Sequence, residues 1–377
     1  MRHGECKSTG GKLVTIDLTI ESGRLGGVKL RGDFFVHPEP KTEEVIRGME
    51  AGLNGLPAEL SETTLAAHIS AAVPFGVELL GTTPEAIAIA VRRAVTGLAD
   101  VGSAPDLTRV GSLDPETLVR LTESWKSIPW RLIPERALSP AMNVALDEVI
   151  TDRVAKQIVP PTLRFWRWSS PAVIIGRCQS VSNEVDRTAA EALGVTIVRR
   201  MTGGGAMFLQ PHGAITYSLY QPETAVAGLS IRQSYELCES WVIRGLRELG
   251  VDAHHVPIND IACSAGKIGG AAQARRAGVV LHHTTIAYDM DPGEMVKVLR
   301  IGREKLKDKA VTSAQKRVSP LVHQTGKSRE EIVEHLFQSF HRRWGGTISE
   351  LSGDEIEEAE RLVREKYGTS SWTCEFD

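Results

Sequence analysis

The sequence predicts an α+β protein of two domains, on three observations. Its 377 residues exceed the roughly 100–200 residues that one domain usually holds. The first hundred residues show a strand hairpin followed by helices, whereas helix and strand patterns alternate from Trp130 onward. Between them lies DVGSAPDLTRVGSLDPE, which is rich in Gly, Pro, Ser and Asp, as linkers are. We therefore expect an N-terminal domain at 1–105, a linker at 106–128 and a second domain at 129–377.

The N-terminal elements follow from periodicity and capping. Residues 13–19, LVTIDLT, alternate apolar and polar side chains, which is the period of a half-buried strand. ESGR then turns the chain and GVKLRGDFF predicts the partner strand, so a hairpin is expected. The patterns TEEVIRGMEAGL and TPEAIAIAVRRAVTGL predict helices, the second with Thr83 as its N-cap and Pro84 at its first position.

The second domain opens with a helical pattern and then alternates. The helix is SPAMNVALDEVITDRVA, and the strands after it are PTLRFWRW, PAVIIGR, GVTIVRRM and GAITYSLY. A long helix, SIRQSYELCESWVIRGLRELG, ends at Gly250, and GVVLHHTTIAYDM predicts another strand. The stretch PETLVRLTESW before this domain predicts a linking helix.

Composition excludes several classes of function. The 44 basic and 47 acidic residues give a net charge of −3, so the whole chain is not committed to nucleic acid or to an anionic membrane. The N-terminus shows no secretory signal, and no run of about 18 apolar residues predicts a spanning helix. Five scattered cysteines without a CxxC pair support neither a zinc ribbon nor a disulfide framework. A reducing cytoplasm is the simplest expectation.

Two glycine-rich segments stand out as candidate ligand sites. VRRMTGGGAMF lacks the Lys-Ser/Thr of a phosphate loop and the third glycine of a dinucleotide fingerprint, so a tight turn between strands stays open as the plain alternative. NDIACSAGKIGGAAQ surrounds Lys267 with small residues that let a ligand approach the backbone. A lysine there suits a carboxylate or a phosphate, although an isolated lysine would more often be a solvated surface residue.

The combination of these segments resembles the lipoate–protein ligases, which share their catalytic fold with biotin ligases. The resemblance covers most of residues 130–372 in six ordered blocks. They are SPAMNVALDE, RFWRWSSPAVIIGRCQ, the glycine loop from Arg199 to Phe208, NDIACSAGKIGGAAQ with its following strand, EKLKDKAVTSAQKRV and EKYGTSSWT. The resemblance implies a mixed sheet flanked by helices as the catalytic domain. GGKLVTIDLTIESGRL and VKLRGDFFVHPEP resemble the small α+β accessory domain of the family, which usually follows the catalytic domain rather than preceding it.

The resemblance implies an ATP-dependent enzyme that activates lipoate as lipoyl-AMP, with Mg²⁺, and transfers the lipoyl group to a lysine of a lipoyl domain or another acceptor protein. Lys267 matches the residue that contacts both lipoate and nucleotide, which makes it the catalytic candidate. Arg200 and the segment Gly205, Ala206, Met207 and Phe208 match nucleotide-contacting positions. Gly203 and Gly204 would leave room for the acyl chain and the adenylate.

Asn259 and Asp260 are further candidates, since a carboxylate near ATP can hold Mg²⁺ or orient the ribose. An Asx turn before AGK is the structural alternative, and no metal ligand is assigned. Arg199 is ambiguous because neighbours on a strand face opposite sides. The pairs His254–His255 and His282–His283 lack a third ligand cluster, which argues against zinc.

Some positions depart from the family pattern. Leu209 stands where the family commonly has a histidine, and His212 lies three residues later. Cys263 lies four residues before Lys267, closer than the nucleophile of cysteine-dependent octanoyltransferases, so we interpret it as a packing residue. The basic run at 303–317 suits either docking of an acidic lipoyl domain or a solvated face. An ATP-independent octanoyl- or lipoyl-transferase and a non-catalytic lipoyl-domain binding protein stay open as alternatives.

Overall fold

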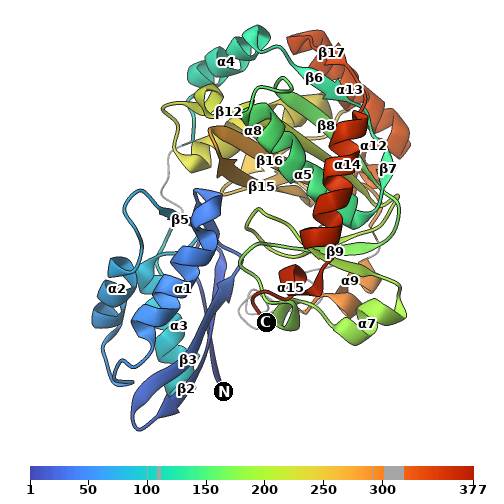
Figure 1. Cartoon of the computed structure of the whole chain (residues 1–377). Coiled ribbons are helices and arrows are strands. Elements are labelled where there is room, and N and C mark those ends of the chain that lie inside the picture. The colour runs from blue at the N-terminus through green and yellow to red at the C-terminus, as the bar shows by residue number, and fades with distance from the viewer. Residues whose placement is uncertain (100, 108–111, 291, 301–317) are drawn as a thin grey trace.

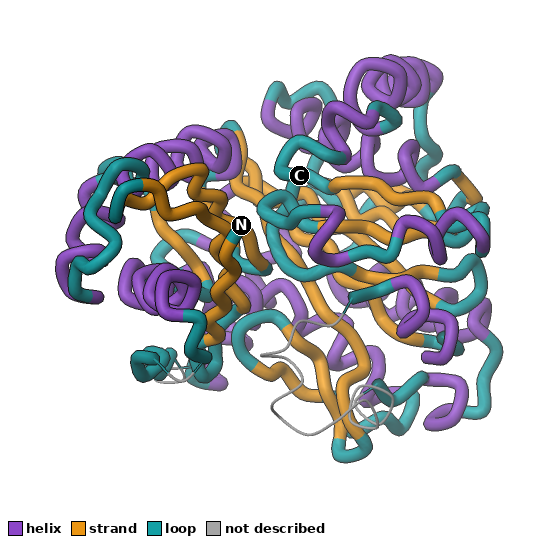
Figure 2. The backbone as a smooth tube through the Cα atoms, turned by 90° about the horizontal axis from the view of Figure 1, so that it is seen from below, coloured by secondary structure: helices purple, strands orange, loops and turns teal. Residues whose placement is uncertain are grey.

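The computed structural model describes residues 1–99, 101–107, 112–290, 292–300 and 318–377. The basic run predicted at 303–317 lies outside these residues. Two α+β units lie side by side in Figures 1 and 2, which view the molecule from directions 90° apart. We refer to residues 1–99 as the N-terminal unit and to residues 112–377 as the C-terminal domain.

The N-terminal unit packs helices against a three-stranded antiparallel sheet of order β1-β2-β3 (Figure 1). Its strands are β1 (Arg2–Lys7), β2 (Leu13–Glu21), β3 (Arg24–Gly32) and a small pair, β4 (Phe35–His37) and β5 (Glu78–Leu80). Its helices are α1 (Thr42–Leu53), α2 (Glu62–Ala71) and α3 (Pro84–Thr96), with a 3₁₀ turn at Glu39–Lys41. Apolar side chains of β2 and β3 form one core with those of the three helices.

The predicted hairpin and helices of this unit are present. Helix α3 begins where the sequence predicts, with the Thr83 side chain accepting a hydrogen bond from the Ala86 N–H. The predicted second strand is divided: Gly32 adopts a φ of +156° and ends β3, while Phe35 begins β4. The break follows because that backbone conformation suits glycine and interrupts the strand ladder.

Part of the predicted linker is packed structure. Helix α4 (Pro115–Ser124) begins at an Asp114 cap and is followed by a 3₁₀ turn, Trp125–Ser127. Trp125 is fully buried in the C-terminal core, where its ring lies 5.6 Å from that of Trp130 and 5.5 Å from that of Trp344. The segment around α4 therefore belongs physically to the C-terminal domain.

The C-terminal domain is built on a mixed sheet of order β13-β14-β15-β16-β12-β8-β6-β17, with β7 also paired to β8. Strands β12, β14, β15 and β16 run antiparallel to their neighbours, whereas β6 and β8 are parallel. The strands are β6 (Arg131–Ile133), β7 (Ala137–Leu138), β8 (Thr162–Trp168), β12 (Ala214–Pro222), β13 (His254–Val256), β14 (Asp260–Cys263), β15 (Gly266–Arg276), β16 (Val279–Ala287) and β17 (Thr347–Ile348).

Helices cover both faces of this sheet, so the predicted α+β class with a mixed, helix-flanked sheet is confirmed (Figure 1). Helices α8 (Ile231–Glu248) and α13 (Arg329–Trp344) pack with the core on one face. Helices α5 (Pro140–Ala155) and α14 (Gly353–Leu362) share the core on the other face. The short helical segments are α6 (Val181–Glu184), α7 (Arg187–Ala192), Glu223–Val226, α9 (Pro292–Val298), α12 (Leu321–Thr325), Val363–Tyr367 and α15 (Ser370–Thr373).

A second sheet of order β10-β9-β11 carries the glycine loop. Strand β10 (Thr196–Arg199) is parallel to β9 (Ala172–Ile175), and β11 (Met207–Leu209) is antiparallel to β9 on its other side. Residues 200–206 therefore cross from one edge of β9 to the other. The loop joins two strands, but they are not neighbours, so it is no tight hairpin turn.

In the described part of the chain, no helix combines the length and apolar character needed to cross a bilayer.

Candidate active site

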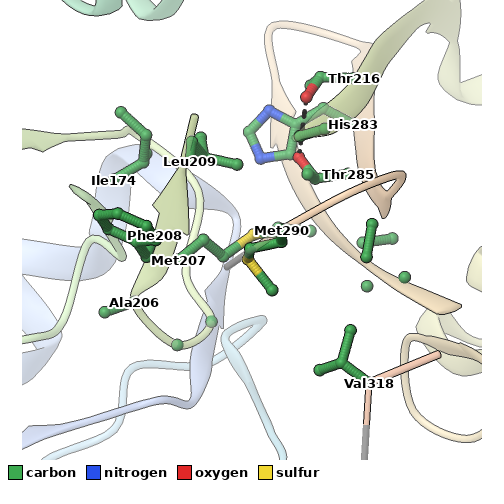
Figure 3. Close-up of a pocket in the computed structure, with 18 of the residues that line it drawn as sticks. Ile174, Ala206, Met207, Phe208, Leu209, Thr216, His283, Thr285, Met290 and Val318 are labelled. Atoms are coloured by element: carbon green, nitrogen blue, oxygen red, sulfur yellow. Dashed lines mark hydrogen bonds between the residues drawn. The ribbon is translucent and has the colours of Figure 1, made fainter. Parts of the chain in front are cut away.

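A cavity of about 350 Å³ opens between the glycine loop, strands β15 and β16, and the N-terminal unit. One wall is apolar and is formed by side chains such as Ile174, Met207, Leu209 and Met290 (Figure 3). The polar side chains come from both units of the molecule. They are Lys12, Asp33, Arg200, Thr216, Asn259, Asp260, Lys267, His283 and Thr285.

The structure brings nearly all predicted site residues to this cavity. The residues that line it are Arg200, Gly204, Gly205, Ala206, Met207, Phe208, Asn259, Asp260 and Lys267. Gly203 faces the N-terminal unit, since an added Cβ would lie 2.7 Å from the Phe34 carbonyl oxygen. Leu209 lies on the apolar wall, while His212 is exposed. Their contacts with ligands stay predictions.

Lys267 is the second residue of β15, and its Nζ donates a hydrogen bond of 2.8 Å to Asp260 Oδ1 on β14. Burial raises the pKa of Asp260, but the charges of Lys267 and Lys12 outweigh that effect and hold the pKa below its ordinary value. The carboxylate is therefore ionised at neutral pH and fixes the ammonium group at the cavity wall. A Cβ added to Gly270 would come within 3.2 Å of Lys267 Nζ, so glycine leaves space around the cation.

Asn259 is held between the two units. Its Oδ1 accepts a hydrogen bond of 2.5 Å from Lys12 Nζ, and its Nδ2 donates to the Ala271 carbonyl. Lys12 lies 247 residues from Asn259, and both Ala271 and the Asp260 partner Lys267 lie on the neighbouring strand β15. The observed bonds are thus those of a site across β14 and β15 and differ from those of an Asx turn.

Arg200 shapes the glycine loop from inside. Its guanidinium donates to the carbonyls of Ile174 at 3.0 Å, Gly203 at 2.6 Å and Gly205 at 3.0 Å. Burial lowers its pKa to about 10, so it stays charged at neutral pH. A positive charge is therefore built into the cavity wall, and the same side chain holds the loop in place.

Arg199 points the other way, as alternation along a strand predicts. It donates to the carbonyls of Gln179, Trp372 and Thr373 and ties β10 to the segment around α15. Burial, and then the charge of Arg177, lower its pKa to about 10. This arginine therefore joins structural elements away from the cavity.

His283 contributes a polar network that the sequence analysis did not identify. Its Nδ1 lies 2.7 Å from Asp147 Oδ2 on α5, and its Nε2 lies 2.9 Å from Thr202 Oγ1 in the glycine loop. Asp147 also accepts hydrogen bonds from Ser218 and Tyr220 on β12. The network fixes the orientation of His283. Figure 3 shows this histidine at the cavity wall, near Thr216 and Thr285.

Lys12 and Asp33 of the N-terminal unit were also missed as site residues. Asp33 accepts a hydrogen bond of 2.8 Å from Gln179 Nε2 and faces Gly205 across the cavity wall. The available signal was weak: each charged residue directly follows a glycine, Gly11 or Gly32, within a segment that resembles an accessory domain.

No cysteine thiol reaches the cavity, and all five cysteines lie in the described part of the chain. Cys263 is 7% exposed and packs in the core beneath β14 with Ile261 and Ile268. Burial raises the pKa of both Cys178 and Cys238 to about 12, which makes them poor nucleophiles. The position of Cys263 therefore agrees with its interpretation as a packing residue.

The carboxylates and histidines bear on whether the site can hold a metal ion. Among the described residues, no group of three or more His, Cys, Asp or Glu side chains has the arrangement of a metal site. His255 hydrogen-bonds to the buried carboxylate of Glu239 at 2.5 Å. Mg²⁺ usually takes one or two protein carboxylates together with substrate phosphates. Asp33 and Asp260 offer oxygens of that kind at the cavity.

Comparisons with known proteins identify the family of the C-terminal domain. The family model of the lipoyl protein ligase A/B catalytic domain matches residues 139–341. An octanoyltransferase LipM from Kyrpidia tusciae is 31% identical over 271 residues, which are 64% of this chain and 97% of that protein. Among solved structures, a bi-partite lipoate protein ligase from Thermoplasma acidophilum, studied with its E2 lipoyl domain, is 28% identical with a TM-score of 0.58. That match covers 66% of this chain and 98% of the other.

A second solved structure is that of a lipoate-protein ligase A bound with ATP. It is 26% identical, with a TM-score of 0.56, and the match covers 66% of this chain and all of the other. The family match begins at residue 139, so Lys12 and Asp33 lie outside it.

Proposed function

The chain belongs to the family of lipoyl protein ligase A/B catalytic domains, and from this premise we propose that it is an ATP-dependent lipoate–protein ligase. The family match and the relatives support an enzyme of the lipoate ligase and octanoyltransferase family. We propose further that the enzyme forms lipoyl-AMP and then modifies a lysine of a lipoyl-type acceptor protein.

One observation carries this proposal: the cavity gathers cations and lacks a thiol. Lys12, Arg200 and Lys267 line it, whereas no cysteine does. Acyl transfer through a thioester would need a thiolate at the cavity, because the thiolate is the nucleophile. Adenylation needs no covalent enzyme intermediate, but it brings a carboxylate and a polyphosphate together, and cations must offset their repulsion.

In the first half-reaction, a carboxylate oxygen of lipoate attacks the α-phosphorus of ATP. The bond from that phosphorus to the bridging oxygen breaks, and pyrophosphate leaves with the electron pair. Lys267, held by Asp260, lies at the wall where both anions would meet. Its compact ammonium group can contact oxygens of both reactants, while Arg200 holds the glycine loop around the nucleotide.

In the second half-reaction, the ε-amine of the acceptor lysine attacks the acyl carbon of the mixed anhydride. The bond to the AMP oxygen breaks, AMP leaves, and the nitrogen gives up a proton. Negative charge develops on the acyl oxygen, and Lys267 is the cation placed to stabilise it. The apolar wall with Met207, Leu209 and Met290 suits the acyl chain, since methionine adapts to irregular ligand surfaces.

Mg²⁺ fits the site as a partner of the nucleotide. Asp33 and Asp260 place carboxylate oxygens at the cavity, and these would hold the ion together with phosphate oxygens. When bound, the ion would neutralise phosphate charge.

An ATP-independent octanoyltransferase is the second candidate, and a specific observation favours it. The curated relative from Kyrpidia tusciae bears that name, at 31% identity over 97% of its own length. By its name, this relative agrees with the transferase better than with the ligase. Such an enzyme would receive an acyl group already activated on a donor and would release no pyrophosphate.

The deciding experiment supplies both kinds of donor. The full chain is incubated with a panel of lipoyl domains and either lipoate with Mg-ATP or an octanoyl carrier protein, and intact mass is read out. We expect a gain of one lipoyl group that requires ATP. A gain from the carrier donor alone, or a thioester trapped on Cys263, would establish the transferase. No gain with any donor would favour a binding protein.

A further inference from the structure

We propose that Lys12 of the N-terminal unit is a second catalytic cation, which binds the pyrophosphate leaving group when the carboxylate is activated. The inference rests on the proposed ligase function and deepens it. It means that the N-terminal unit supplies a residue to the reaction that the family match, starting at residue 139, does not contain.

Lys12 is held at both ends. Its backbone N–H donates to the Gly81 carbonyl at 2.7 Å, and its Nζ donates to Asn259 Oδ1 at 2.5 Å. Gly81 has a φ of +90°, and a Cβ there would lie 2.5 Å from Lys12 Cγ. A glycine is therefore needed to let the lysine stem pass toward the cavity. This is the placement of a directed side chain, unlike that of a solvated surface lysine.

The unit that carries Lys12 is itself fixed beside the glycine loop (Figures 1 and 2). Asp33 accepts a hydrogen bond from Gln179, and its own N–H donates to the Leu13 carbonyl at 2.9 Å, next to Lys12. Gly203 packs so closely on the Phe34 carbonyl that no side chain fits between them. Lys12 and the glycine loop therefore keep a defined relation to each other.

The described cations at the cavity outnumber the described carboxylates, which favours binding of an anion. Among the described residues, three cations, Lys12, Arg200 and Lys267, line the cavity together with two carboxylates, Asp33 and Asp260. Asp260 interacts with both lysines, and the amide oxygen that Lys12 contacts is uncharged. The ammonium group of Lys12 lines the cavity beside Asn259, where it can donate a charge-assisted hydrogen bond to a phosphate oxygen.

The two half-reactions differ in the charge they release. Activation expels pyrophosphate, which carries away the charge of two phosphate groups, whereas transfer expels only AMP. Lys267, which is bonded to Asp260, serves the carboxylate and the α-phosphate. Lys12, which is bonded to the neighbouring Asn259, is the second cation and serves the leaving β- and γ-phosphates. Lys12 should therefore matter for activation and hardly at all for transfer.

The test uses the full chain with Lys12→Met, which keeps the stem and removes the charge, and Lys12→Arg, which keeps a charge. Lys29→Met is the matched control, because Lys29 is an exposed lysine on β3 of the same unit. Pyrophosphate release is measured with lipoate and Mg-ATP, and acceptor mass is followed with synthetic lipoyl-adenylate. Binding of inorganic pyrophosphate is measured by calorimetry, and melting temperatures verify folding.

We expect Lys12→Met to lower pyrophosphate release on the order of 10²-fold, the usual effect of removing one charge-stabilising donor. Transfer from lipoyl-adenylate should change by less than about twofold, since no pyrophosphate leaves in that step. Pyrophosphate binding should weaken in Lys12→Met, Lys12→Arg should regain part of the activity, and Lys29→Met should behave as the wild type.

Three results would overturn the assignment. Unchanged pyrophosphate release by Lys12→Met would show that Lys12 only makes a structural contact between the units, and the ligase function would stand. An equal fall of both half-reactions would show that the substitution displaces the unit. A wild-type chain that releases no pyrophosphate but accepts an acyl group from a carrier would refute the ligase function, and the role of Lys12 with it.

Discussion

Lys267 lies in a gap made by small residues, and its neighbours set what it can do. Gly270 leaves space beside its Nζ, and Asp260 directs the ammonium group to the cavity wall. This lysine was predicted as a site residue because glycine and alanine surround it in the sequence, and the structure shows the effect of these small residues. They leave room for the ammonium group of Lys267, since even a Cβ at Gly270 would lie 3.2 Å from its Nζ.

We predict that Lys267→Arg and Lys267→Ala both lower the rate of pyrophosphate release with lipoate and ATP by about 10²-fold or more. Arginine fails because its planar fork does not replace a point charge that contacts two reactants. Both variants should keep the melting temperature within a few degrees, because the Lys267 side chain is 44% exposed. Release at the wild-type rate by Lys267→Ala would remove Lys267 from the mechanism.

His37 is a residue whose effect is on stability rather than on catalysis. It is 3% exposed, and neither ring nitrogen has a hydrogen-bond partner in the described structure. Burial, and then the charge of Arg275, lower its pKa from 6.5 to about 3. Between these values the unfolded chain binds a proton and the native protein does not, so stability falls as the pH falls below 6.5.

We predict that His37→Phe removes this part of the acid sensitivity. Between pH 7.5 and 5.5 the wild type should lose about 1.4 kcal/mol more free energy of unfolding than the variant does. Urea denaturation of both proteins at the two pH values measures the difference. Parallel losses would show that His37 titrates in the native protein, contrary to its burial.

At the scale of elements, the sequence predicted what local patterns encode. The β2–β3 hairpin follows from alternation, and α3 and α8 follow from caps and helical periods. Strand β15 was not predicted, because GKIGGAAQARR is rich in Gly and Ala, which are uncommon in strands. It forms because β14 and β16 pair with it on both sides.

The glycine loop offers a matched pair of substitutions. Gly204 has a φ of +91°, and a Cβ there would lie 2.9 Å from Arg200 Nη2. A Cβ at Gly205 would meet Asp33 at an ordinary 3.5 Å. We predict that Gly204→Ala lowers the free energy of unfolding by about 1–3 kcal/mol and weakens binding of lipoate and ATP together. Gly205→Ala should cost less than about 0.5 kcal/mol.

Calorimetry with both ligands and chemical denaturation of the two variants measure these effects. Normal ligand affinity in Gly204→Ala would reduce the loop to a simple connection between β10 and β11.

At the scale of the whole molecule, the site depends on contacts that no local pattern reveals. Lys12 and Asn259 are 247 residues apart, and His283 and Asp147 are 136 residues apart. Neither pairing has a period or a spacing that a single sequence displays. The resemblance identified the residues on the C-terminal domain but assigned no site residue to the N-terminal unit, since nothing in the chain shows how two units dock.

The segment 372–377 joins the two units. Phe376 is 3% exposed and belongs to the core of the N-terminal unit, and its carbonyl accepts a hydrogen bond of 2.6 Å from Arg31 on β3. Glu375 forms two hydrogen bonds, of 2.6 and 3.0 Å, with Arg177 beside the glycine-loop sheet. The guanidinium groups of Arg31 and Arg177 both lie over the Phe376 ring, at 4.8 and 4.9 Å from its centre.

We predict that Phe376→Ala loosens the docking of the N-terminal unit and so acts on catalysis at a distance. Loss of a buried aromatic ring should lower the free energy of unfolding by about 3 kcal/mol. Phe75→Ala is the matched control, because Phe75 belongs to the same unit and is fully exposed. Since the N-terminal unit holds Lys12 against Asn259, pyrophosphate release should fall more than transfer from synthetic lipoyl-adenylate.

Denaturation and the two half-reaction assays test this at a temperature where both variants stay folded. A loss of stability with both half-reactions unchanged would mean that the site assembles without this contact, and that other contacts such as that of Gln179 with Asp33 suffice to place Lys12.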